Sequence, residues 1–117
     1  METTEKESPA RKSPSTSPTQ RSLKYLREKG YHCEVVERWN PWTKQRRDLW
    51  TWCDILAIRK DEVLAVQVTA SAVADRIKKI QDSETVAKVR EAGIRIEVHG
   101  HRKNSKGKYV MRIEDIS

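Results

Sequence analysis

Residues 53–69, CDILAIRKDEVLAVQVT, constrain the fold more than any other part of the chain. Two apolar runs, at residues 55–58 and 63–66, flank a short charged turn, and this pattern predicts a β-hairpin. An antiparallel hairpin brings the start of its first strand beside the end of its second. We therefore expect Asp54 to meet Gln67 and Thr69 at one end of a small sheet. An acid and two polar groups at a shared strand end indicate a metal or phosphate site.

The composition sets the limits of the fold. The 117 residues, 36% of them hydrophobic, suffice for one compact domain with a modest core. No run approaches the ~20 apolar residues that span a bilayer, and the N-terminus lacks the apolar segment of a secretory signal. Cys33 and Cys53 lack metal-ligand spacing and suit buried thiols in a reducing cytosol, so we expect a cytoplasmic protein; a disulfide between them is the alternative.

The formal net charge of +7 is unevenly distributed along the chain. Residues 1–19 are rich in Ser, Thr and Pro, contain equal numbers of acidic and basic residues, and are predicted to be a disordered tail. The whole net charge therefore lies on residues 20–117, the predicted domain. A basic domain favours an anionic partner, most commonly nucleic acid. A basic surface that only maintains solubility is the alternative.

The apolar spacing predicts the order of the remaining elements. A helix is expected over residues 20–29, ended by Gly30, followed by a strand over 31–36 and a long loop over 37–52. After the hairpin, two helical segments begin at Ser71 and Ser83 as caps, and strands follow over 94–99 and 109–113. The order is α-β-β-β-α-α-β-β, and the helical step is long enough for a parallel crossover. The sequence thus predicts an α/β fold: a single domain with a mixed β-sheet flanked by helices.

Three segments carry a resemblance to a known family. Gln20-Arg21-Ser22-Leu23 stands at the start of the first helix, Asp54 opens the hairpin, and Gln67-Val68-Thr69 ends it. With the order of elements, these resemble the PD-(D/E)XK nuclease superfamily, which has a restriction-endonuclease-like fold. Within it, the chain looks similar to small Holliday junction resolvases and to phage-type proteins that share its ERWN, DLW and HGHRK stretches. The resemblance covers roughly residues 20–114.

The resemblance implies Mg²⁺- or Mn²⁺-dependent hydrolysis of DNA, with acidic ligands and an activated water, by a two-fold homodimer. It also implies that Asp54 is a metal ligand, with the Gln67 side chain and the Val68 carbonyl as weaker ones. The chain departs from the family's pattern at three positions. Gln67 and Thr69 replace the Glu and Lys of Glu-x-Lys, and Gln20 replaces a helix glutamate. The catalytic candidates therefore retain a single acid.

Two nearby groups are candidates to replace the missing carboxylate and the missing lysine. Asp48 lies six residues before Asp54, so a curled loop can return its carboxylate to the site. Arg76, Lys78 and Lys79 on the next helix can supply the missing positive charge. The alternative for these cations is the solvated flank of a helix that buries its apolar stripe.

The loop over residues 37–52 holds all four tryptophans, interleaved with basic residues. Cations contact phosphates, and indoles stack on unpaired bases or wedge into a distorted duplex. We expect Trp50 and Trp52 to lie mostly in the core and Trp39 and Trp42 to be exposed. The candidate nucleic-acid-binding residues in this loop are Arg38, Trp39, Trp42, Lys44, Arg46 and Arg47.

A second basic cluster follows at residues 99–108 and includes Arg102 and Lys103, with Arg76 as a further candidate for binding nucleic acid. A charged strand end that protects a sheet edge from aggregation is the alternative. His99 and His101 share a strand face there, but no third ligand for a transition metal is in view.

Three functions remain open at this point. The first is a metal-dependent DNA endonuclease, the second is an inactive descendant that only binds DNA, and the third is a protein-interaction module that uses the Trp-rich loop. Salt-sensitive DNA binding separates the first two from the third. Cleavage that depends on Asp54 separates the first from the second.

Overall fold

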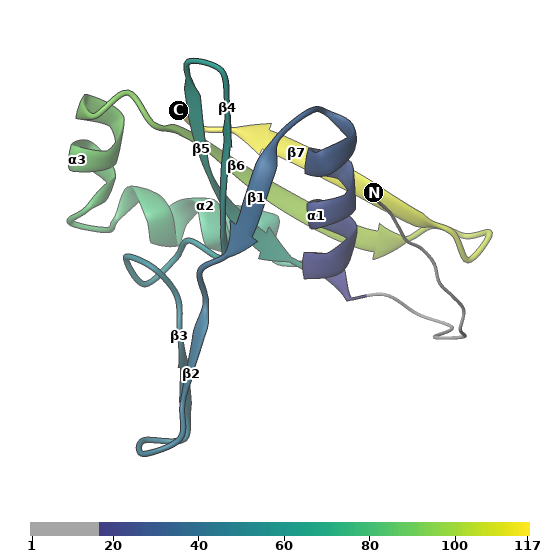
Figure 1. The fold of residues 1–117 in the computed structure, drawn as a ribbon. Coiled ribbons are helices and arrows are strands. Elements are labelled where there is room, and N and C mark those ends of the chain that lie inside the picture. Colours follow the sequence, from purple (N-terminus) through teal and green to yellow (C-terminus); the bar gives the residue numbers. More distant parts are fainter. Residues whose placement is uncertain (1–16) are drawn as a thin grey trace.

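The computed structural model describes residues 17–117, which form a mixed five-stranded sheet with helices on its two faces (Figure 1). The strand order is β1-β4-β5-β6-β7, and only the β5–β6 pair is parallel. The strands of this sheet are β1 (His32–Val35), β4 (Ile55–Arg59), β5 (Glu62–Thr69), β6 (Arg95–Lys103) and β7 (Tyr109–Asp115). The helices are α1 (Pro18–Glu28), α2 (Val73–Gln81) and α3 (Val86–Glu91). The predicted α/β class, mixed sheet and parallel crossover are confirmed.

The first helix has clear start and stop signals. The Ser17 hydroxyl accepts a hydrogen bond from the Gln20 amide at 3.1 Å, and Pro18 occupies the first helical position. Gly30 adopts a φ of +90° and ends the helix in a Schellman motif, in which the Tyr31 amide bonds back to the Leu26 carbonyl. Of the predicted tail, residues 1–16 lie outside the described part, and residues 17–19 form the start of α1.

The predicted hairpin over residues 55–66 is confirmed as β4 and β5, and β5 is buried on both faces. Its alternating side chains separate two cores. The core under α1 includes Leu23, Leu26, Ile55, Leu64 and Val66. The core under α2 and α3 includes Trp52, Ala65, Ile80, Val89 and Ile96.

The expectation of a plain loop over residues 37–52 is wrong. Two short strands, β2 (Arg38–Asn40) and β3 (Gln45–Arg47), pair as a hairpin that projects away from the main sheet (Figure 1). These three-residue strands are mostly polar and lack the apolar alternation that signals a strand. Their pairing therefore left no pattern for a sequence-based prediction to detect.

The tryptophans divide largely as predicted. Trp39 and Trp42 are 59% and 92% exposed, and Trp52 is fully buried with its indole Nε1 donating to Thr85 Oγ1 at 3.1 Å. Trp50 is only half-buried and packs against the core from the edge. It therefore remains accessible to a partner.

The predicted caps of the later helices are wrong. The α2 helix begins after Ala72, whose amide donates to Thr69 Oγ1 at 3.1 Å, so the threonine organises this start instead of Ser71. Ser83 lies before α3 and accepts from the Thr85 amide, without capping the helix itself. Several Ser and Thr residues precede these helices, and tertiary packing decides which of them reaches a free amide.

Cys33 and Cys53 are both buried free thiols, as predicted. None of the helices within residues 17–117 has the length and apolar character needed to cross a membrane.

Gly100 on β6 packs closely against Val73 at the start of α2. A Cβ atom at this position would lie 2.4 Å from Val73 Cγ2, so β6 and α2 pack together only because residue 100 has no side chain. We expect Gly100→Ala to lower the free energy of unfolding by about 1–3 kcal/mol through this overlap. Urea unfolding of Gly100→Ala, Val73→Ala and the double variant checks it. If the double variant loses as much free energy of unfolding as the two single variants together, the result would contradict this contact.

Candidate functional site

A pocket of about 650 Å³ lies at the end of the sheet where β4 begins and β5 ends. We call it the acidic pocket. Glu37, Asp48 and Asp54 line it together with Gln67 and the start of α2. Other lining residues are Ser17, Pro18, Thr19, Arg46, Val68, Thr69, Ala70, Ser71, Ala72 and Arg76. The predicted meeting of Asp54, Gln67 and Thr69 at one strand end is thus realised.

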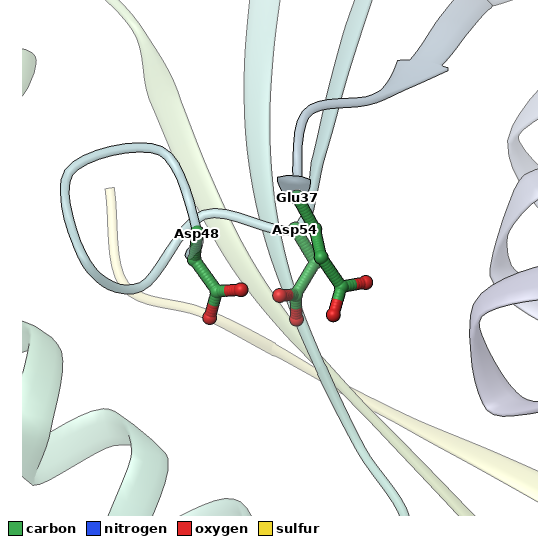
Figure 2. A group of neighbouring side chains, drawn as sticks. All are labelled: Glu37, Asp48 and Asp54. Atoms are coloured by element: carbon green, nitrogen blue, oxygen red, sulfur yellow. The ribbon is translucent and has the colours of Figure 1, made fainter. Parts of the chain in front are cut away.

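Three carboxylates converge in this pocket. Glu37, Asp48 and Asp54 each offer an oxygen atom, and these atoms all lie within 4.8 Å of one another; Figure 2 shows the side chains directed into the same space. Glu37 follows β1 and Asp48 follows β3, so the two residues flank the β2–β3 hairpin at its base. The Val36 amide donates to the Asp54 carbonyl at 2.8 Å, which fixes Glu37 beside the third acid.

Asp54 is the most deeply buried of the three, with 6% of its surface exposed. Its Oδ2 accepts hydrogen bonds from Gln67 Nε2 at 2.7 Å and from the Val68 amide at 2.8 Å. Burial raises the pKa of Asp54 from 3.8 to about 7, against the Val68 hydrogen bond, which lowers it, and the neighbouring carboxylates of Asp48 and Glu37 raise it further. The three carboxylates repel one another when no metal is bound. A cation bound between them is therefore stabilised by their negative charge.

Gln67 has an unsatisfied acceptor. The side chain is 2% exposed, and its Nε2 donates to Asp54 Oδ2 and to the Val68 carbonyl at 3.2 Å, which fixes the orientation of the amide. The other atom, Oε1, is buried and has no hydrogen-bond partner within residues 17–117. A buried acceptor without a partner costs about 1–3 kcal/mol. The three carboxylates by themselves make an all-oxygen donor set, which is the chemistry that Mg²⁺, Mn²⁺ and Ca²⁺ bind.

Two arginines border the acids. Arg76 on α2 lines the acidic pocket, and its Nε is buried without a hydrogen-bond partner in the described part of the chain. Arg46 on β3 pairs with Glu37 at 3.2 Å. The lysines of α2 lie elsewhere: Lys78 is mostly exposed and pairs with Asp82 at 3.1 Å, and Lys79 is exposed outside the pocket. Of the three candidate cations on α2, the structure brings only Arg76 to the acids.

The remaining catalytic candidates lie at the margin. Thr69 lines the pocket, but its hydroxyl accepts the Ala72 amide. The Val68 carbonyl lies beside the acids and accepts the Gln67 amide. Gln20 is exposed in the first turn of α1, where Ser17, Pro18 and Thr19 line the pocket and Gln20 does not.

The candidate nucleic-acid-binding residues form two separate groups. Trp39 and the basic residues of the β2–β3 hairpin lie next to the acids, with Arg38 opposite Arg47 and Trp39 opposite Arg46. Arg102 and Lys103 are exposed at the C-terminal end of β6, just after Gly100, which is paired with Thr69. The two histidines of this second cluster are buried and contact Ser22, so they contribute nothing to the basic surface.

Sequence reasoning did not select Glu37 as a site residue. The feature that could have identified it is its position directly after the strand over residues 31–36. Because β1 runs antiparallel to β4, β1 ends where β4 begins, next to Asp54. Recognising it required knowing that β1 pairs with the first strand of the hairpin.

Comparison with known proteins yields one likeness. No family model and no curated protein matches this chain. A solved structure is similar to it with a TM-score of 0.47 and 18% sequence identity, over 80% of this chain and 73% of the other. That structure is Archaeoglobus fulgidus Hjc, described as a Holliday junction resolvase from an archaeal hyperthermophile.

Proposed function

We propose that this chain is a metal-dependent nuclease that hydrolyses phosphodiester bonds in duplex or branched DNA at the acidic pocket. The observation that carries the proposal is the convergence of three carboxylates beside Gln67, whose Nε2 bonds Asp54 and whose Oε1 is buried without a partner in the described residues. The gathered negative charge destabilises a metal-free protein, and a divalent cation among the carboxylates would offset it. The Gln67 and Thr69 substitutions remove the carboxylate and lysine of Glu-x-Lys, and Glu37 and Arg76 stand nearby with the same charges.

Each residue then has a distinct part. Glu37, Asp48, Asp54 and Gln67 Oε1 would hold a Mg²⁺ or Mn²⁺ ion, and Asp54 would fix its position, because this carboxylate is held by the Val68 amide. When bound, the cation polarises a phosphate and lowers the pKa of a water molecule. Arg76 presents a guanidinium to the same pocket, where it would bind a phosphate oxygen.

The charge of the surroundings supports a polyanionic substrate. The chain carries a formal charge of +7. Four of its basic residues lie on the hairpin whose base holds Glu37 and Asp48, namely Arg38, Lys44, Arg46 and Arg47. Basic groups around an acidic centre attract nucleic acid and leave the centre free for a cation.

The test is a cleavage assay on labelled linear duplex, single-stranded and four-way-junction DNA, with Mg²⁺, Mn²⁺ or EDTA. We expect wild-type cleavage only with metal, and a loss of about a hundredfold or more in Glu37→Gln, since a metal site contributes several kcal/mol to such reactions. Glu34→Gln is the matched control, because Glu34 is an exposed glutamate three residues away on β1.

Salt-dependent DNA binding without cleavage in any metal would contradict the proposal and leave a protein that acts by binding alone. Equal cleavage by Glu37→Gln and Glu34→Gln would place the chemistry away from the acidic pocket.

A further inference from the structure

A second pocket lies at the base of the β2–β3 hairpin, next to the acidic pocket. We call it the tryptophan pocket. It has a volume of about 640 Å³ and is lined by Trp39 and Trp50, by the apolar side chains of Pro41 and Leu49, and by Arg38 and Arg47. Asp48 lines both pockets. Whatever occupies the tryptophan pocket is therefore a near neighbour of the three carboxylates.

The walls of the tryptophan pocket combine aromatic faces with cations. Trp39 is 59% exposed although it is a large apolar side chain. Trp50 is half-buried, with its ring 5.7 Å from the ring of the fully buried Trp52, so the core holds it in place from behind. Arg38 and Arg47 are directly opposite one another on the hairpin and both are exposed. Aromatic faces beside guanidinium groups suit a planar base on a phosphate backbone.

The backbone that presents Trp50 is strained. Trp50 and Thr51 have φ values of +57° and +70°, which are unfavourable for a tryptophan and for a β-branched threonine. The turn is closed by the Trp52 amide, which donates to the Leu49 carbonyl at 3.2 Å, and by paired hydrogen bonds between Leu49 and Cys53. Asn-Gly or similar residues are preferred in a turn with two positive φ values. A strained turn that holds an aromatic wall is typical of a binding site.

We infer that the tryptophan pocket binds one unpaired nucleobase of a DNA strand whose neighbouring phosphate lies at the acidic pocket. This inference rests on the proposed function, because it places a nucleic-acid strand at the carboxylates. A paired base is held inside the duplex stack, so the pocket selects DNA with an unstacked base, such as a bulge, a branch point or a single strand. An apolar peptide is the other occupant that such a surface accepts, and the two arginines favour the polyanion.

The test is a binding measurement in EDTA, so that cleavage plays no part. Fluorescence anisotropy compares a labelled duplex with a one-nucleotide bulge, the same duplex with an abasic bulge, and the fully paired duplex. We expect wild type to bind the bulged base about tenfold more tightly than the abasic bulge, the effect of stacking one base. Trp39→Ala should remove this preference, and Trp39→Phe should retain most of it.

Tyr109→Ala is the control, because Tyr109 is a large side chain that is 43% exposed on β7 and does not line the tryptophan pocket. It should keep the preference between the two bulges. Equal affinity for the bulged base and the abasic bulge would overturn the inference, even in a protein that cleaves DNA with metal. A preference for the bulged base in a protein that cleaves nothing would support the inference and count against the nuclease. Failure to bind any of the three DNAs would overturn it in favour of a protein partner.

Discussion

The Asp54→Asn variant is expected to lose metal-dependent cleavage by about a hundredfold or more, and at the same time to melt at a higher temperature than wild type in EDTA at pH 8. The two effects have one cause. Asparagine keeps an oxygen that accepts from Gln67 Nε2 and the Val68 amide, and it replaces the other carboxylate oxygen, in the cluster with Asp48 and Glu37, with an uncharged donor. The variant therefore removes one negative charge from the cluster. This change relieves the repulsion among the carboxylates and weakens their attraction for a cation.

The gain in stability should depend on pH in a defined direction. The pKa of Asp54 is raised from 3.8 in the unfolded chain to about 7 in the folded protein, so the folded state binds the extra proton between these values. Wild type consequently loses stability as pH rises towards 7. The difference in melting temperature between Asp54→Asn and wild type should be largest above pH 7 and vanish near pH 4.

Thermal melts across this pH range, with EDTA and with Mg²⁺ or Mn²⁺, check both effects. Metal should raise the melting temperature of wild type and leave that of Asp54→Asn unchanged. Asp61→Asn is the matched control, because Asp61 lies in the exposed β4–β5 turn with a φ of +59° that asparagine also tolerates. An Asp54→Asn protein that is less stable than wild type at pH 8 in EDTA would contradict the described carboxylate cluster.

Ser22→Ala is expected to destabilise the protein strongly. Ser22 is fully buried on α1, and its Oγ bonds His99 Nδ1 at 2.9 Å and His101 Nε2 at 2.7 Å. His99 Nε2 in turn bonds Glu97 Oε1 at 2.9 Å. One direction of donation satisfies the whole chain: His101 donates to Ser22, Ser22 to His99, and His99 to Glu97. Alanine would leave two buried imidazole nitrogens without partners, at about 1–3 kcal/mol for each.

Urea unfolding measures this loss, with Ser105→Ala in the exposed β6–β7 turn as the matched control. The same network makes the protein sensitive to acid, because burial, followed by Arg21 and His99, lowers the pKa of His101 from 6.5 to about 4. Between these values the unfolded chain binds the proton, so stability falls as pH falls from 6.5 to 4. Asp54 acts in the opposite direction, and the Asp54→Asn background therefore removes this opposing contribution. Unchanged stability in Ser22→Ala would contradict the buried network.

The network has a consequence for the candidate site. Ser22 ties α1 to β6, and the residues just before and at the start of α1, Ser17 and Pro18, line the acidic pocket. We therefore expect Ser22→Ala to disturb this wall of the pocket without changing a carboxylate.

Local patterns were enough to predict much of the fold. The alternation at residues 55–66 predicted β4 and β5, and with them the placement of Asp54 beside Gln67. The predicted stop at Gly30 ends α1 through bonds between near neighbours in the chain. Such features depend on periodicity and on the first and last turns of an element, which the sequence shows directly.

Other features were beyond local patterns. The short β2–β3 hairpin has no apolar alternation, and Trp50 was expected in the core but lies half-buried at a pocket wall. Ser22 showed no sign of its role, because its partners His99 and His101 lie 77 and 79 residues away.

From its residues alone, this chain is predicted to be a basic α/β protein with an acid at the start of one strand and an amide at the end of the next. The folded arrangement was needed to show that Glu37 and Asp48 join that acid and that Arg76, among the three cations of α2, lines the same pocket. Strand periodicity specifies which face of the sheet a side chain occupies. The distance between side chains from separate loops depends on which strands pair and in which register.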